Sequence, residues 1–106
     1  MDKWISNFLN YNKDLVGLAD WEILITKEDL KDGSFAEIVP DIFEKEVYVT
    51  LPPIFFTFIK KRQKNILLHE LIHCRVLIHR IEVKDFVERS EELMVNDLTR
   101  GMEKLI

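Results

Sequence analysis

The spacing of hydrophobic residues changes along this chain, and it predicts helices near both ends with strands between them. Near the N-terminus, apolar side chains recur three and four positions apart at Trp4, Ile5, Phe8 and Leu9. This spacing is typical of one face of an amphipathic helix. We therefore expect a short helix over residues 2–13.

Three later segments have the composition of β-strands. They are residues 21–26 (WEILIT), residues 35–39 (FAEIV, stopped by Pro40 and Asp41) and residues 46–51 (EVYVTL). In the last of them, Val47, Val49 and Leu51 would share one face, because side chains alternate along a strand. The short connections predict a small three-stranded, mostly antiparallel sheet with one covered face.

The second half of the chain predicts two helices joined by a linker. Residues 63–80 are apolar on nearly all sides, so we expect a largely buried central helix. Residues 81–89 are expected to form the linker. Ser90 is a good N-cap for a last helix that ends near Leu105.

A short apolar run, residues 54–59 (IFFTFI), precedes the central helix. One interpretation is a loop or helical turn tucked under the core. The other is an exposed patch in which Ile54, Phe55, Phe56 and Phe58 would bind a partner or a second copy of the chain.

The central helix contains His69-Glu70-Leu71-Ile72-His73, an instance of the HExxH motif. Helical residues four apart lie on one face, so His69 and His73 can offer two imidazoles to one metal ion. Zinc suits this donor set, because it takes nitrogen ligands tetrahedrally and can keep one position for water. Glu70 reaches the same side and is placed to deprotonate that water. Since buried polar groups need partners, histidines in a buried helix favour a metal.

A catalytic zinc needs a third protein ligand, and three candidates follow the motif. His79 comes six positions after His73, which on a continuing helix turns its side chain about 240° away. Glu91 and Glu92 begin the last helix, and helical phase slightly favours Glu91. The alternative role of both glutamates is to help that helix start. Cys74 points about 100° away from His73 and is expected to be a small core residue.

Composition narrows the class of protein. The chain has 106 residues, of which 47% are hydrophobic and 32% charged, and this predicts one globular domain. The net charge of -4 argues against nucleic-acid binding through a basic face. We expect a cytoplasmic protein, because there is one cysteine, no apolar run long enough to span a membrane and no recognisable secretion signal.

The order of these motifs resembles the gluzincins, which are zinc metallopeptidases of the zincin class, and most of all their very short prokaryotic and phage-type forms. The resemblance rests on HELIH, on the strands Trp21-Glu22-Ile23 and Val47–Leu51, and on Glu92-Leu93-Met94-Val95-Asn96. It implies a minimal zincin over residues 1–106, an α+β fold with the sheet packed on the HELIH helix. His69, His73 and Glu92 would bind zinc, with Glu70 as general base. Asn96, where larger gluzincins have aspartate, would support one of the ligands.

The implied activity is zinc-dependent hydrolysis of peptide bonds, so the protein would be a protease. Similar minimal zincins can be latent as purified. A substrate peptide would add to the edge strand of the sheet, expected at Val47, Tyr48 and Val49. Tyr48, His79 and Arg100 are candidates for stabilising the oxyanion.

Two other classes of protein stay open. One is a zinc-stabilised, non-catalytic interaction module that binds its partner through Ile54–Ile59, in which Glu70 would have no role. The other is a metal-free α+β domain in which HELIH is an ordinary stretch of core helix.

Overall fold

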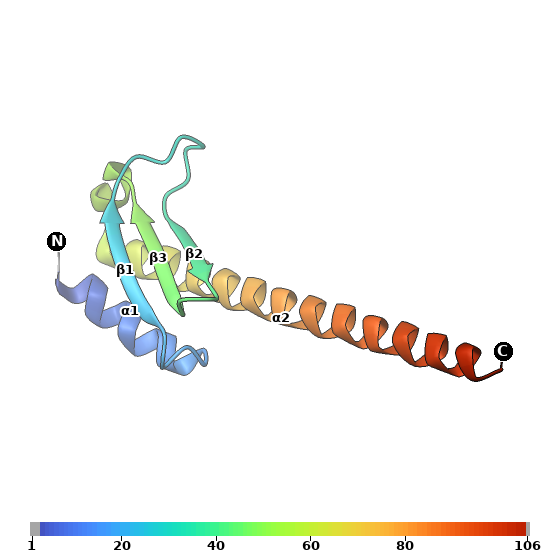
Figure 1. Ribbon diagram of the computed structural model, residues 1–106. Helices are drawn as coiled ribbons and strands as arrows, with labels where there is room; N and C mark the ends of the chain where they lie inside the picture. The colour runs from blue at the N-terminus through green and yellow to red at the C-terminus, as the bar shows by residue number, and fades with distance from the viewer. Residues whose placement is uncertain (1–2, 106) are drawn as a thin grey trace. The chain divides into compact units, whose positions relative to one another are not determined.

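The computed structural model describes the backbone of residues 3–105 and the side chains of residues 3–91. The elements follow in the order α1 (Lys3–Leu15), β1 (Glu22–Lys27), β2 (Glu37–Asp41), β3 (Glu46–Leu51), the 3-10 turn η1 (Pro53–Thr57) and α2 (Lys60–Leu105) (Figure 1). The chain forms two compact units, Met1–Val76 and Leu77–Ile106. The α+β class expected from the sequence is confirmed.

The three strands form a mixed sheet in the order β1-β3-β2. β3 runs parallel to β1 and antiparallel to β2, so the expectation of a mostly antiparallel sheet is wrong for the β1–β3 pair. Parallel neighbours need a crossover of a dozen or more residues. Residues 28–45, which include β2, supply that crossover.

β3 is the central strand, and the prediction that residues 46–51 form an edge strand is therefore wrong. Val47 is paired with Ile23 of β1 on one side and with Pro40 of β2 on the other. A strand with neighbours on both sides has no free main-chain groups to bind an added peptide. The two edges of the sheet belong to β1 and β2.

One face of the sheet is covered, as the sequence predicts. Val47, Val49 and Leu51 are at most 1% exposed, whereas Tyr48 between them is 42% exposed. Side chains alternate along the strand, and α1 and the first part of α2 lie on one side of the sheet (Figure 1), so their buried side chains belong to the core on the Val47 face. They are Ile5 and Leu9 of α1 with Leu67, Leu71 and Cys74 of α2.

β2 begins and ends two residues later than predicted, and Pro40 lies inside it, opposite Val47. An edge strand tolerates proline, because the missing N–H can lie on the side without a neighbour. Phe35, expected in this strand, lies instead in the loop before it.

α1 ends within two residues of the predicted position, in a hydrogen-bonded cap at Gly17. The amide of Leu18 donates to the carbonyl of Lys13 (2.8 Å), and the amide of Gly17 donates to the carbonyl of Asp14 (3.2 Å). This pair of bonds is a Schellman motif. Gly17 has a φ of 81°, which glycine adopts at little steric cost. The cap leads the chain toward the buried Trp21 and into β1.

The first part of α2 buries only one face. Gln63, Leu67, Leu71 and Cys74 are buried at helical spacing, whereas Ile72 is 49% exposed. The expectation of a helix buried on most sides is therefore wrong. Both histidines of HELIH are also exposed. Their burial is therefore no argument for a bound metal.

The unit of residues 77–106 is helical as far as Leu105, so the predicted linker at residues 81–89 and the new helix start at Ser90 are wrong. No glycine or proline interrupts residues 81–89. The hydroxyl of Ser90 donates to the carbonyl of Phe86 (2.9 Å), as a serine inside a helix can. Within the described part of the chain, no helix is both long and apolar enough to cross a membrane.

The apolar run of residues 54–59 forms η1 and its flanks. Phe55 is fully buried, and the side-chain amide of Gln63 donates to its carbonyl oxygen (3.0 Å). These contacts agree with the interpretation of a turn under the core, and Phe55 is not part of an exposed patch. Ile54 and Ile59 are exposed.

Candidate metal and catalytic site

The two histidines of HELIH lie side by side on the exposed side of α2. The Nε2 atoms of His69 and His73 are 3.0 Å apart, and their rings meet at 76° with centroids 4.4 Å apart. Two nitrogens bound to one tetrahedral zinc at 2.0–2.1 Å lie about 3.3 Å apart. The pair thus fits two ligands of one metal ion. The same separation suits a hydrogen bond between a protonated and an unprotonated ring nitrogen.

Glu70 lies at the wall of a cavity of about 430 Å³. Residues 34–36, in the loop before β2, form one side of the cavity. α2 forms the other, with Ile66 and His69 beside Glu70. Since this volume is in the range of small-ligand sites, the cavity can hold part of a ligand next to the carboxylate and one histidine of the motif.

Arg62 lines the same cavity together with Phe35. Its guanidinium carbon lies 4.1 Å from the centre of the Phe58 ring and 5.5 Å from that of Phe35. The two rings meet edge to face, with centroids 5.1 Å apart. Stacking on aromatic rings stabilises a guanidinium and leaves its N–H groups available at the edges.

The described side chains do not bring together a complete set of three metal ligands: no group of three or more His, Cys, Asp or Glu among them could hold a metal ion. His79 and Glu91 are exposed and, like Glu92, belong to the unit of residues 77–106. The side chains of Glu92 and Asn96 lie outside the described residues. Residues 81–89, expected to form the linker before these glutamates, are helical. The third ligand stays a prediction.

The strand residues expected to meet the substrate lie elsewhere. Val47 and Val49 are buried in the core. Tyr48 lies on the uncovered face of the sheet, where its hydroxyl donates a hydrogen bond to the carboxylate of Glu46. This bond is the largest cause that raises the pKa of Tyr48 to about 12. Because α2 packs on the opposite face, Tyr48 is not placed to stabilise an oxyanion at HELIH. Arg100, the other candidate for that role besides His79, has a side chain outside the described residues.

Cys74 is a core residue, as predicted. It is 1% exposed, and burial raises the pKa of its thiol to about 11. A neutral thiol is a poor metal ligand, so Cys74 does not substitute for a third ligand.

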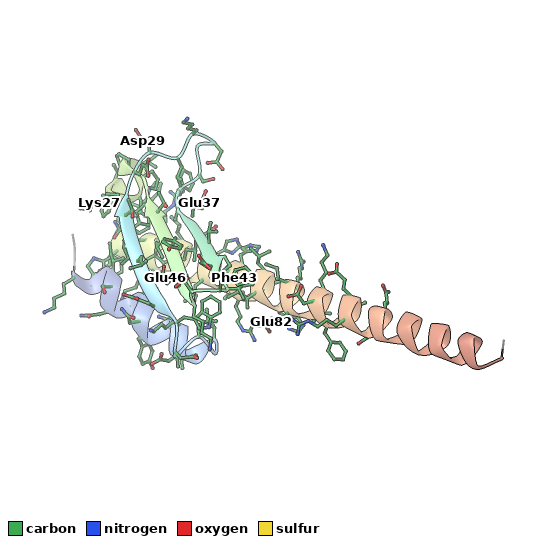
Figure 2. All side chains as sticks on the ribbon, in the orientation of Figure 1. Lys27, Asp29, Glu37, Phe43, Glu46 and Glu82 are labelled. Carbon is green, nitrogen blue, oxygen red and sulfur yellow. The ribbon has the colours of Figure 1, made fainter. Side chains whose placement is uncertain are left out.

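A second cavity, of about 450 Å³, lies at the end of the sheet where β1 and β3 stop. Lys27 and Asp29 are on its wall (Figure 2), with the ammonium of Lys27 lying 4.6 Å from the centre of the Phe56 ring. No residue of HELIH lines this cavity, so it is separate from the histidine pair.

No protein-family model matches this chain, and no curated protein or solved structure does so. The assignment of function therefore depends on the residues themselves. The sequence pointed to His69, Glu70 and His73, but it did not reveal Arg62 or Phe35. Helical spacing offered one signal for Arg62, which comes seven positions before His69 and so lies on the same side of α2. Phe35 is brought to the site by the loop before β2, for which no pattern in the sequence gave a signal.

Proposed function

We propose that this protein is a zinc-dependent hydrolase of peptide bonds, with His69 and His73 as two of the metal ligands and Glu70 as general base. The observation that carries the proposal is the 3.0 Å separation of the histidine Nε2 atoms, close to that of two ligands on one tetrahedral zinc. Glu70 lies one residue from His69 and faces the cavity.

In the proposed reaction, Glu70 would transfer the proton and the cavity would bind the substrate. Bound zinc would supply a water molecule acidic enough to be deprotonated near neutral pH. Glu70 would take that proton and return it to the leaving amine as the peptide bond breaks. The cavity beside Glu70 would hold the substrate close to the carboxylate.

The third ligand in this proposal is Glu92, on the resemblance to gluzincins, with Asn96 supporting a ligand. Glu91 and His79 are the alternatives. Because residues 81–89 are helical, the proposal requires a carboxylate to reach the histidines by a route other than the expected linker. A second copy of the chain could supply this carboxylate.

The test is a peptidase assay on zinc-loaded protein, using a mixture of unstructured peptides and mass spectrometry of the products. We expect cleavage by the wild-type protein and none by Glu70→Gln at matched zinc content. Cleavage by the Glu70→Gln protein at the wild-type rate would count against the proposal, because the activity would then not depend on Glu70.

The exposed Ile54 and Ile59 support a second candidate function, a zinc-stabilised interaction module. In that case Glu70 would be dispensable. A Glu70→Gln protein that keeps its zinc and still binds its partner, with no peptidase activity in the wild type, would favour the module over the enzyme.

A further inference from the structure

We infer that the cavity beside Glu70 is a binding pocket for a peptide carboxylate, with Arg62 as the residue that receives it. The inference rests on the proposed function only for the position of the cleaved bond. The pocket itself is a feature of the described residues and can be tested without hydrolysis.

Arg62 is a cation without an acidic partner in the described part of the chain. The ion pairs found there join Lys45 to Asp20 and Lys84 to Glu88. The guanidinium instead lies over the rings of Phe58 and Phe35. This stacking limits where the side chain can turn, and a positioned guanidinium can bind a carboxylate through two parallel N–H···O bonds.

The cavity wall next to Arg62 suits an apolar side chain. Phe35, Ala36 and Ile66 form much of it, and Asn65 adds an amide that can donate to or accept from a peptide backbone. The ligand that matches this lining is a peptide with an apolar residue in the cavity and a carboxylate at Arg62.

Distance along α2 sets how far that carboxylate lies from the bond to be cleaved. Arg62 and His69 are seven residues apart on one side of the helix, which corresponds to about 10 Å along its axis. An extended peptide rises about 3.3 Å per residue. The carboxylate would therefore be about three residues from the scissile bond, either as the C-terminus of the peptide or as an Asp or Glu side chain.

The experiment measures binding to the full-length Glu70→Gln protein, which does not depend on turnover. Three fluorescent peptides share one apolar core: the first ends in a free carboxylate, the second in an amide, and the third in an amide with an aspartate at the equivalent position. We expect at least tenfold tighter binding of the first or third peptide than of the second, because charge-assisted hydrogen bonds to arginine are strong. Tight binding of only the first assigns the C-terminus, and tight binding of only the third assigns the acidic side chain.

Substitution at Arg62 tests the assignment, and Lys61 provides the matched control. Arg62→Gln should abolish the preference for the carboxylate, whereas Lys61→Gln, which removes the same charge from an exposed neighbour, should keep it. Equal binding of all three peptides to the protein with Arg62 intact would overturn the inference, and this comparison does not require the Arg62 variant to fold. A carboxylate preference that persists in Arg62→Gln would also overturn it.

The two proposals fail in different ways. If the protein binds carboxylate peptides through Arg62 but cleaves nothing in the presence of zinc, the carboxylate-binding role of the cavity is supported and the peptidase proposal is contradicted. If it cleaves amide and acid peptides equally well, the peptidase proposal is supported and the carboxylate-binding role of the cavity is contradicted.

Discussion

The Nε2 atoms of His69 and His73 lie 3.0 Å apart, one helical turn from each other on the exposed side of α2. Residues four apart on a helix are neighbours, so the helix itself determines this pairing. Glu70 is held on the wall of the adjacent cavity by the same helix. A single five-residue stretch of α2 therefore positions the three residues that we propose for zinc-dependent hydrolysis: His69, Glu70 and His73.

Replacing Glu70 by glutamine should remove activity and leave zinc binding intact. The amide keeps the shape of the side chain but cannot accept the proton, and general base catalysis typically contributes about 10²- to 10⁴-fold in rate. We expect kcat to fall by that factor with nearly unchanged zinc content, measured on the same preparation. A loss of zinc equal to the loss of activity would contradict the role of Glu70 as a base.

Glutamine substitutions at Glu91 and Glu92 should separate the candidates for the third ligand. A lost carboxylate ligand should weaken zinc binding by at least tenfold, since ligand loss exceeds the 10- to 100-fold effect of losing a supporting residue. Competition with a chromophoric chelator measures this affinity. Glu82→Gln is the control, because Glu82 is an exposed glutamate of α2 that is not a candidate ligand (Figure 2). If Glu91→Gln and Glu92→Gln both behave like the control, neither residue is a ligand, and His79→Ala is the next variant to measure.

Neighbouring residues of HELIH should differ sharply in their contribution to stability. Leu71 is fully buried, whereas Ile72 is 49% exposed. Leu71→Ala should lower the free energy of unfolding by about 2–5 kcal/mol, because it leaves a cavity in the core. Ile72→Ala should lower it by less than about 1 kcal/mol. Urea denaturation of the metal-free proteins measures both, and equal losses would mean that the buried face of α2 is assigned wrongly.

Tyr48 should ionise only in strongly alkaline solution. Its hydrogen bond to Glu46 raises its pKa to about 12, so the folded state holds the phenolic proton more tightly than the unfolded state. The stabilisation is present below pH 10 and is lost as the pH rises toward 12. Ultraviolet titration in a Tyr11→Phe background isolates Tyr48, and Glu46→Gln should shift its pKa back toward 10. An unshifted titration in the Glu46→Gln protein would show that Glu46 is not the cause.

Periodicity predicted the local elements well, because it reports which side chains share a face. The bounds of β3 agree at both ends, α1 agrees to within two residues, and the alternation at Val47, Tyr48 and Val49 matches their burial. Strand order is not contained in such a pattern. The long connection over residues 28–45, which contains β2, lets β3 pair with β1 on one side and with β2 on the other. The sheet is mixed as a result.

The length of α2 and the exposure of HELIH were predicted less well. Residues 81–89 were expected to form a linker, but they contain no glycine or proline to break a helix. The many apolar residues of α2 suggested burial all round, whereas Ile72 and Val76 are exposed. The motif itself could be predicted because both histidines come from one helix. Arg62 and Phe35 meet through tertiary packing of a loop on α2, and sequence spacing does not describe that contact.

The most direct test of the central claim is the amount of zinc per chain, measured by native mass spectrometry on protein purified without added metal or an affinity tag. The account predicts about one zinc per chain, lost in His69→Ala and in His73→Ala. It also predicts that zinc raises the melting temperature of the wild type, because a ligand that binds only the folded state stabilises it. A wild-type protein that holds no zinc, takes up none when it is added and melts at an unchanged temperature would contradict the account.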